Sequence, residues 1–163
     1  SSLIWWLQKL ANILLDIASL NTSMPEYLPE YIPDSVGEDW RRGVVRRART
    51  YIEESIANSE ELSMHSTQFN GRVMLARVDA LEGDVDSALE HLHGMLLGAH
   101  SDVQRADLWY WMWNIDKTFA TDELDVGNAR REEHRLEALK LYTVLFQETS
   151  RYEYRLRIDK LTL

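Results

Sequence analysis

The sequence of 163 residues contains no cysteine, and it has only 3 prolines and 7 glycines. Without cysteine the chain forms no disulfide and offers no thiolate to a metal, which favours a reducing compartment, the cytoplasm. The scarcity of proline and glycine, together with frequent Leu, Ala, Glu and Arg, favours helices over strands. No run of alternating apolar and polar residues is long enough to indicate a strand. We therefore expect an all-α fold.

Basic residues are fewer than acidic ones: the chain has 18 Lys and Arg and 27 Asp and Glu, so its net charge is -9. Such a surface repels a phosphate backbone, so the composition argues against a nucleic-acid partner. Hydrophobic residues make up 45% of the chain, and its length suits one compact domain. Within that domain we expect an N-terminal helix and strap over residues 1–34, followed by a helical region over residues 35–163.

The opening segment SSLIWWLQKLANILLDIASL is the most apolar part of the sequence. Its polar residues fall on one side of a helical wheel, a stripe that a membrane-spanning helix has no reason to keep: Gln8, Lys9, Asn12, Asp16 and Ser19. We expect this helix to dock onto the rest of the protein. The alternative is that it contacts a membrane or a partner through Trp5 and Trp6.

Prolines interrupt the next segment, NTSMPEYLPEYIPDSVGE, and forbid a regular helix there. We expect an extended strap that packs four apolar side chains against neighbouring helices, namely Tyr27, Leu28, Tyr31 and Ile32.

Capping signals mark the helix starts that follow. Three segments match the capping box, in which side chain and backbone satisfy each other's free groups: Ser35-x-x-Glu38, Ser101-x-x-Gln104 and Ser150-x-x-Glu153. Asp84 is a further candidate N-cap. Together with the apolar spacing, these signals predict about seven helices, over residues 3–20, 36–59, 64–82, 85–99, 102–119, 129–149 and 151–161. The short turns between them predict antiparallel neighbours.

The segment FNGRVMLARVDALEGDVDSALEHLHGMLLGAH, residues 69–100, reads as a helix, a Gly-Asp turn and a second helix. It resembles a tetratricopeptide repeat, whose usual period is about 34 residues. The matching positions are Leu75, Ala76, Gly83, Asp84, Ala88, Leu92 and Leu96. Arg72 and Asp79 depart from the family pattern, and Ala138, the next small residue of this kind, comes more than one period after Ala88. The resemblance implies a short right-handed array of stacked helical hairpins with a protein-binding groove.

The segment DLWYWMWNID, residues 107–116, holds three tryptophans in five positions. Apolar residues cover most of its helical wheel, which indicates a helix buried on two sides, with Trp109 and Trp113 in the core. Tyr110 and Trp111 border the polar edge formed by Asp107 and Asn114. An exposed Trp beside polar groups has the composition of an interface hot spot. We therefore predict a partner-binding groove at Arg77, Asp107, Tyr110, Trp111 and Asn114.

A second candidate surface comes from the segment DWRRGVVRRART, which carries five arginines in nine residues. Its arginines form either a solvated face with local ion pairs or a docking patch for an acidic partner or an anionic lipid surface. The candidate residues are Arg41, Arg42, Arg46 and Arg49.

No phosphate-binding loop, nucleophile elbow or converging set of histidines is present in the sequence. We therefore expect no metal, no cofactor and no enzymatic activity. The function indicated is that of a scaffold or adaptor that binds a protein or peptide. The alternative is a ligand-sensing regulatory domain of a larger signalling protein, recognisable by a closed pocket beside Trp109–Trp113.

Overall fold

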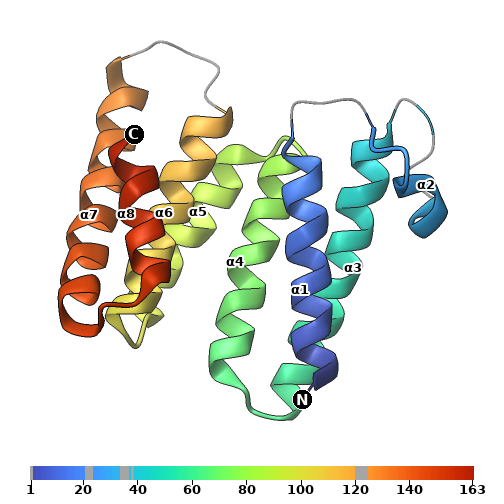
Figure 1. Cartoon of the computed structure of the whole chain (residues 1–163), viewed down its shortest axis with the longest axis horizontal. Helices are drawn as coiled ribbons and strands as arrows, with labels where there is room; N and C mark the ends of the chain where they lie inside the picture. The colour runs from blue at the N-terminus through green and yellow to red at the C-terminus, as the bar shows by residue number, and fades with distance from the viewer. Residues whose placement is uncertain (1, 21–23, 34–36, 38, 120–124) are drawn as a thin grey trace. The chain divides into compact units, whose positions relative to one another are not determined.

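The computed structural model describes residues 2–20, 24–33, 37, 39–119 and 125–163. Within these residues the chain is helical and contains no strand, which confirms the all-α fold (Figure 1). The elements are α1 (Ser2–Ala18), α2 (Leu28–Tyr31), α3 (Trp40–Glu61), α4 (His65–Leu81), α5 (Val85–Met95), the 3-10 turn η2 (Leu96–Gly98), α6 (Asp102–Phe119), α7 (Asp125–Thr149) and α8 (Tyr152–Thr162).

The helix ends follow the capping signals in part. The amide of Gln104 donates to the Ser101 hydroxyl over 3.2 Å, and the Gln104 side chain accepts from the His100 amide over 2.7 Å, so α6 starts as predicted. The capping box predicted at Ser150 does not form. Ser150 has a positive φ of 54°, and α8 begins after Arg151, which forms no side-chain cap. The box at Ser35 lies outside the described residues. Helix α7 begins at Asp125, four residues earlier than the sequence indicates.

The chain divides into two compact units, Ser1–Asp84 and Val85–Leu163. The boundary expected after residue 34 falls inside the first unit. The observed division falls at the turn of the segment that resembles a tetratricopeptide repeat, so α4 and α5 belong to different units. Gly83 ends α4 with a φ of 96°, and the amides of Gly83 and Asp84 donate to the carbonyls of Ala80 and Asp79 in a Schellman motif.

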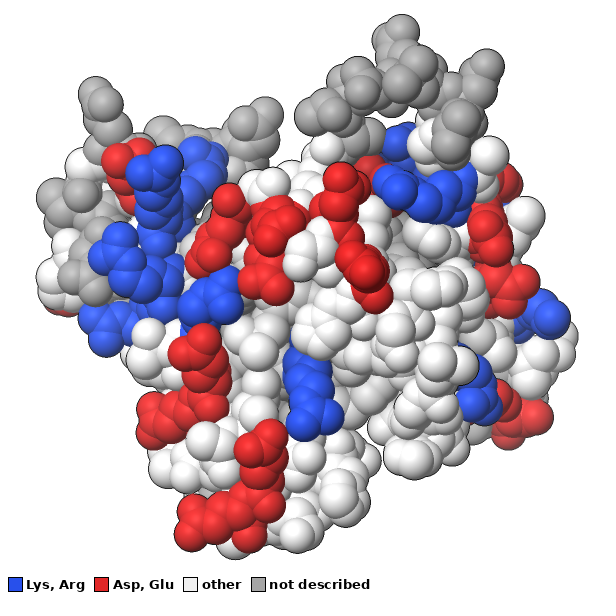
Figure 2. All heavy atoms as spheres, turned by 180° about the vertical axis from the view of Figure 1, so that it is seen from behind, with Lys and Arg blue, Asp and Glu red and all other residues white. Residues whose placement is uncertain are grey.

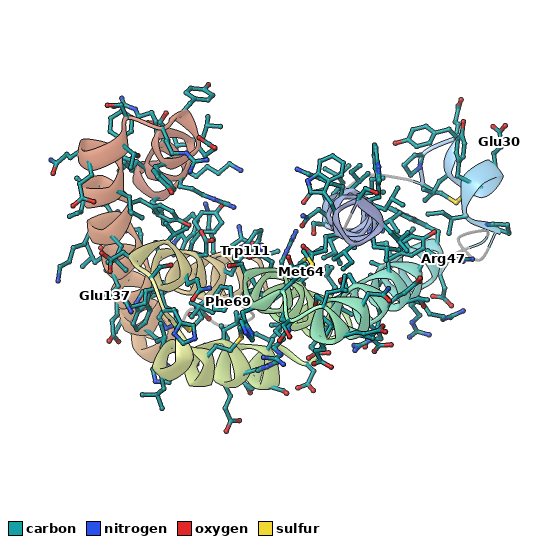
Figure 3. All side chains as sticks on the ribbon, turned by 90° about the horizontal axis from the view of Figure 1, so that it is seen from below. Glu30, Arg47, Met64, Phe69, Trp111 and Glu137 are labelled. Atoms are coloured by element: carbon teal, nitrogen blue, oxygen red, sulfur yellow. The ribbon has the colours of Figure 1, made fainter. Side chains whose placement is uncertain are left out.

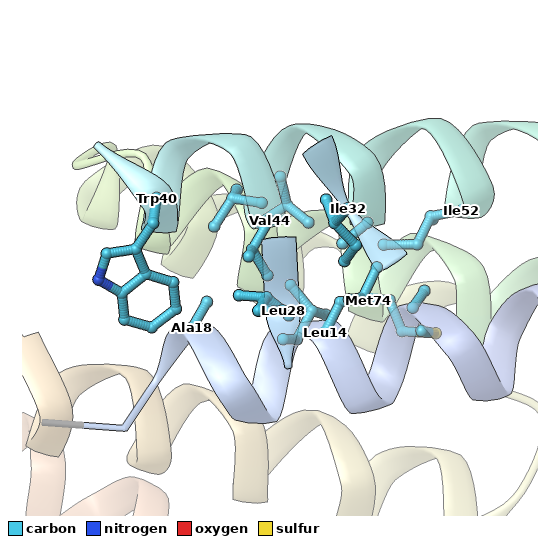
Figure 4. Packing of buried hydrophobic residues seen from close by; sticks show 13 residues of the cluster. Leu14, Ala18, Leu28, Ile32, Trp40, Val44, Ile52 and Met74 are labelled. Atoms are coloured by element: carbon cyan, nitrogen blue, oxygen red, sulfur yellow. The ribbon is translucent and has the colours of Figure 1, made fainter. Parts of the chain in front are cut away.

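The first unit packs α1, α3 and α4 against one another (Figure 1). Its core is an apolar cluster to which the three helices and the α2 segment all contribute (Figure 4). From α1 come Ala11, Leu14, Leu15 and Ala18; from α3 come Trp40, Val44, Val45, Ala48 and Ile52; and from α4 come Met74 and Val78. Small residues such as Ala48 and Ala11, both fully buried, allow the helix axes to approach closely.

The polar stripe of α1 faces α4 over much of its length. Gln8 donates to the carbonyl of Thr67 over 2.9 Å. Arg77 of α4 donates to Asn12 over 2.9 Å and to the Asp16 carboxylate over 3.1 Å. Arg77 is only 8% exposed, so its prediction as a groove residue is wrong: its guanidinium holds α1 onto α4. The N-terminal helix thus docks onto the protein as expected.

The proline-containing strap behaves as predicted at two of its four apolar residues. Leu28 and Ile32 are buried in the first-unit core, whereas Tyr27 and Tyr31 are exposed. The strap is also not extended throughout, because Leu28–Tyr31 forms one helical turn with proline in its first turn, where no amide hydrogen is required. One helical turn places residues four apart on the same side, so Leu28 and Ile32 point inward together and the tyrosines point away.

The second unit packs its helices in sequence order, α5 on α6, α6 on α7 and α7 on α8. Contacts between residues far apart in sequence show that α6 and α7 are antiparallel, since Asp107 pairs with Tyr142 and Asp116 with Arg130. The core shared by α6, α7 and α8 is aromatic, and its buried members are Ala106, Tyr110, Trp113, Ala138, Tyr142, Leu145, Tyr154 and Leu161. None of the described helices has the length and the apolar character that crossing a membrane requires.

One glycine sets the distance between α3 and α4. A Cβ added at Gly71, which is fully within α4, would lie 2.6 Å from Cγ1 of Ile56 on α3. Because that atom is bonded directly to the branched Cβ of a partly buried side chain, it has little room to move.

We expect Gly71→Ala to destabilise the first unit by about 1–3 kcal/mol, despite the higher helix propensity of alanine, because overpacking outweighs propensity. Chemical denaturation followed by circular dichroism measures this change. Gly94→Ala is the matched control, since a Cβ there meets no atom within 4 Å, and it should be neutral or stabilising. Equal effects of the two substitutions would contradict the close approach at Gly71.

Candidate functional site

Helix α6 places its aromatic residues on more than one buried side. Tyr110 and Trp113 are buried in the core shared with α7 and α8. Leu108, Met112 and Ile115 lie elsewhere on the helix and are also buried. This confirms the interpretation of α6 as a helix covered over most of its circumference. It also corrects the role of Tyr110, which is 2% exposed and so cannot be a surface contact.

The remaining aromatic side chain at this edge, Trp111, is half-buried and lies beside a cation that the sequence did not point to (Figure 3). The guanidinium of Arg157, on α8, lies 3.9 Å from the ring centre of Tyr110 and 5.2 Å from that of Trp111. Tyr110 and Trp111 meet edge to face at 5.2 Å. Stacking of this kind holds the guanidinium plane in one orientation.

A partly buried carboxyl group completes this cluster. The hydroxyl of Tyr142 on α7 donates a short hydrogen bond to the carboxylate of Asp107. Burial raises the pKa of Asp107, and it does so against the lowering effects of the Tyr142 hydrogen bond and the Arg157 charge. Burial also raises the pKa of Tyr142, with the negative charge of Asp107 as the next cause. We refer to Asp107, Tyr110, Trp111, Tyr142 and Arg157 as the Trp111 cluster.

The structure thus brings together three of the groove residues predicted on α6. Asp107 and Trp111 lie in the Trp111 cluster with Tyr110 beneath them, and Asn114 lies half-buried one turn further along α6. Arg77 belongs to the first unit and is engaged there. Arg157 and Tyr142 were missed, because their partners are 35 or more residues away in the sequence, and local spacing carries no signal for such contacts.

The predicted arginine surface lies on α3, and it is only partly available (Figure 2). Figure 2 shows basic side chains gathered over α3 with acidic side chains beside them. Arg49 donates to Asp79 over 2.8 Å and to Glu82 over 2.9 Å, so it ties α3 to the end of α4. Arg41 donates to the carbonyl of Leu20 and stacks on Trp40. Arg42 and Arg46 are the exposed members of the predicted patch.

A second polar cluster lies between α5, α6 and α7. His134 is 6% exposed, lies 5.6 Å from the ring centre of Trp109, and leaves its Nδ1 atom buried without a hydrogen-bond partner in the described part of the chain. Burial lowers the pKa of His134, as do the charges of Arg130 and His93, while Asp116 and Glu133 oppose them. Nearby, Asp116 accepts two hydrogen bonds from Arg130, at 2.8 and 3.2 Å.

Neither cluster has the donor set of a metal centre: in the described ranges, no three His, Asp or Glu side chains are grouped so that they could hold an ion. The chain matches no protein-family model, no curated protein and no solved structure. The tetratricopeptide resemblance therefore depends on the pattern of residues 69–100 alone.

We expect Asp107→Asn to stabilise the protein at neutral pH, because it removes a negative charge that burial disfavours and keeps an acceptor for Tyr142. A carboxyl whose folded pKa is raised costs stability above that pKa, and the cost disappears as the pH falls to the unfolded value near 4. The advantage of the variant should therefore shrink as the pH is lowered from 7 to 4 in urea denaturation. An advantage independent of pH would contradict a buried ionised Asp107.

His134 makes the opposite contribution to the pH dependence. Because its folded pKa lies below the unfolded value of about 6.5, the neutral form stabilises the fold above pH 6.5, and this stability is lost as the pH falls below 6.5. Between pH 7.5 and 5 we expect the wild type to lose on the order of 1 kcal/mol more than His134→Gln. His91→Gln, at an exposed position on α5, is the control and should follow the wild type. Parallel curves for all three proteins would show that His134 titrates normally.

Proposed function

We propose that this chain is a non-enzymatic helical module of the cytoplasm that binds a partner protein or peptide, and that the Trp111 cluster is its contact surface. The proposal is carried by the position of Arg157, whose guanidinium lies over the ring of Tyr110 and close to the ring of the half-buried Trp111. Trp, Tyr and Arg are the residues that most often dominate binding energy, since they combine a large apolar area with hydrogen-bond donors.

The packing beneath the cluster supports this role. Tyr110 and Tyr142 are fully buried, so the side chains that would touch a partner stand on a rigid aromatic base and lose little freedom on binding. The Tyr142–Asp107 hydrogen bond joins α7 to α6 one helical turn before Trp111. An acceptor on the partner, such as a backbone carbonyl or a carboxylate, would face the guanidinium of Arg157, and an apolar side chain would cover the indole of Trp111.

The exposed arginines of α3 provide a second surface for the same function. Arg42 and Arg46 project from the first unit, and the ion pair of Arg42 with Asp39, at 4.0 Å, joins two exposed side chains and is weak. An acidic partner segment would bind there through charge attraction that falls with ionic strength. Binding at the Trp111 cluster, by contrast, depends largely on an aromatic surface and should fall less steeply with salt, so the two surfaces can be distinguished.

Affinity capture from the native source, followed by mass spectrometry and a direct binding assay with the captured partner, tests the proposal. We expect Trp111→Ala and Arg157→Ala each to weaken binding by about tenfold or more, since both remove a central anchor. Tyr152→Ala is the matched control, because Tyr152 is an exposed aromatic residue of the same unit that lies outside the cluster, and it should bind as the wild type does.

Trp111→Phe controls for loss of folding, since it keeps an aromatic ring in the packing of α6 while removing the indole. We expect it to unfold at the wild-type temperature and to bind more weakly. If every partner binds all four variants with the wild-type affinity, the Trp111 cluster is not the contact surface. If the affinity falls only for Arg42→Glu and Arg46→Glu, the contact surface is α3.

A further inference from the structure

Helix α1 carries a second apolar stripe that the other described helices of the first unit leave exposed. One apolar face packs into the first-unit core through residues such as Ala11 and Leu15. A different set of apolar side chains, exposed by 42 to 57%, runs along the outside of the same helix: Leu3, Trp6, Leu10 and Ile13. We call these four residues the outer stripe. A contiguous exposed apolar surface of this kind marks an interaction site.

The spacing of the outer stripe indicates what covers it. Its residues are separated by three, four and three positions, the alternation of the a and d positions of a heptad repeat, and the partly buried Ile17 continues the pattern. The alternation of three and four keeps these side chains in one row along α1, and a second helix can pack along such a row. The outer stripe therefore has the spacing that a partner helix requires.

We propose that the outer stripe binds α1 of a second copy of this chain, in antiparallel orientation, so that the protein forms a two-fold symmetric dimer. In an antiparallel helix pair the a positions of one helix meet the d positions of the other. Leu10 then lies opposite Ile13 of the second copy, and Trp6 lies opposite Ile17. Both contacts occur twice because of the symmetry.

The charges beside the seam fit this register. Lys9 and Asp16 occupy the g positions, which face each other across an antiparallel pair. With Leu10 opposite Ile13, Lys9 lies near Asp16 of the second copy, and the pair forms twice. The shifted register, with Leu3 opposite Ile13, instead brings the two Lys9 side chains together. Asp16 accepts from Arg77 through Oδ1, but its side chain remains 76% exposed and can accept from a lysine as well.

The area and charge of α1 also favour a second copy over a lipid surface. The outer stripe and Ile17 would remove roughly 500 Å² from water on each copy, or about 1,000 Å² in total, which is the lower end of specific interfaces. Helices that lie on membranes usually carry several basic residues on their polar face. Helix α1 has one, Lys9, balanced by Asp16, and the chain as a whole carries a net charge of -9.

Sedimentation equilibrium of the full chain over about 1–200 µM measures the association, a range that spans the affinity expected of a small interface. We expect a monomer–dimer equilibrium that Trp6→Ala weakens by about tenfold or more. Tyr31→Ala is the matched control, because Tyr31 is an exposed aromatic residue of the same unit that lies outside α1. Lys9→Glu should weaken the dimer by about fivefold, because it replaces two attractive pairs with two repulsive ones.

Disulfide cross-linking tests the orientation of the two helices. Because the sequence contains no cysteine, only the introduced thiols can react. Leu10→Cys and Ile13→Cys are prepared as separate proteins and oxidised alone and as a mixture. In the proposed register the mixture forms the 10–13 disulfide faster than either protein links to itself. Faster self-linking of each protein would indicate a parallel pair and would overturn the proposed arrangement.

Three further outcomes would overturn the dimer itself. The first is a monomer at every concentration, and the second is a dimer that Trp6→Ala and Tyr31→Ala weaken equally. The third is a monomer that floats with phosphatidylcholine–phosphatidylserine vesicles in a manner dependent on Trp6, which would assign the outer stripe to a lipid surface. Circular dichroism of every variant confirms that the helices are retained, as expected for exposed positions.

Discussion

The constraint on which this structure depends is that two of its helices are apolar over more of their surface than one neighbour can cover. Helix α6 is the first: its aromatic and aliphatic residues occupy several sides, and nearly all of them are buried, from Leu108 to Ile115. Helix α1 is the second, and there only one of two apolar stripes is buried within the first unit. The same physical demand is therefore met within the chain for α6 and remains unmet for α1. Because of this difference we propose an interface on α1 itself, whereas α6 supports the contact surface at the Trp111 cluster.

Polar side chains hold the helices together where a sequence pattern suggests that they face water. Gln8, Asn12 and Asp16 form a stripe that looks solvated on a helical wheel, yet all three bond to α4. Arg49 likewise bridges α3 to Asp79 and Glu82. These bonds fix the register of helices whose apolar faces, rich in alanine and valine, would allow sliding. Arg77 is itself buried, and its guanidinium is bonded to Asn12 and Asp16, so it is unavailable to a ligand. This explains why a groove residue predicted from its sequence position has a structural role.

The sequence predicts the helices well because helix formation is signalled locally. Apolar spacing, capping residues and glycine gave seven long helices whose ends mostly lie within a few residues of those observed, and Gly83 adopts the positive φ that the turn requires. What the sequence cannot give is contact between distant residues. Arg157 carries no local sign that it stacks on Tyr110, and Tyr142 none that it bonds to Asp107. The short turn at Leu28–Tyr31 was missed for a related reason, since prolines that forbid a long helix are compatible with one turn.

The two apolar stripes of α1 show why an amphipathic pattern is an incomplete guide to burial. A wheel that contains one polar arc is usually interpreted as having one apolar face opposite to it. In α1 the polar arc is itself an internal contact, so the helix needs a neighbour on that side and another on the adjacent side. The outer stripe then lies on the remaining side, where a heptad spacing persists although no element of the first unit uses it. A spacing of this regularity is costly to keep on an exposed surface, because each large apolar side chain there promotes non-specific association. Its presence is best explained by a helix that packs on it.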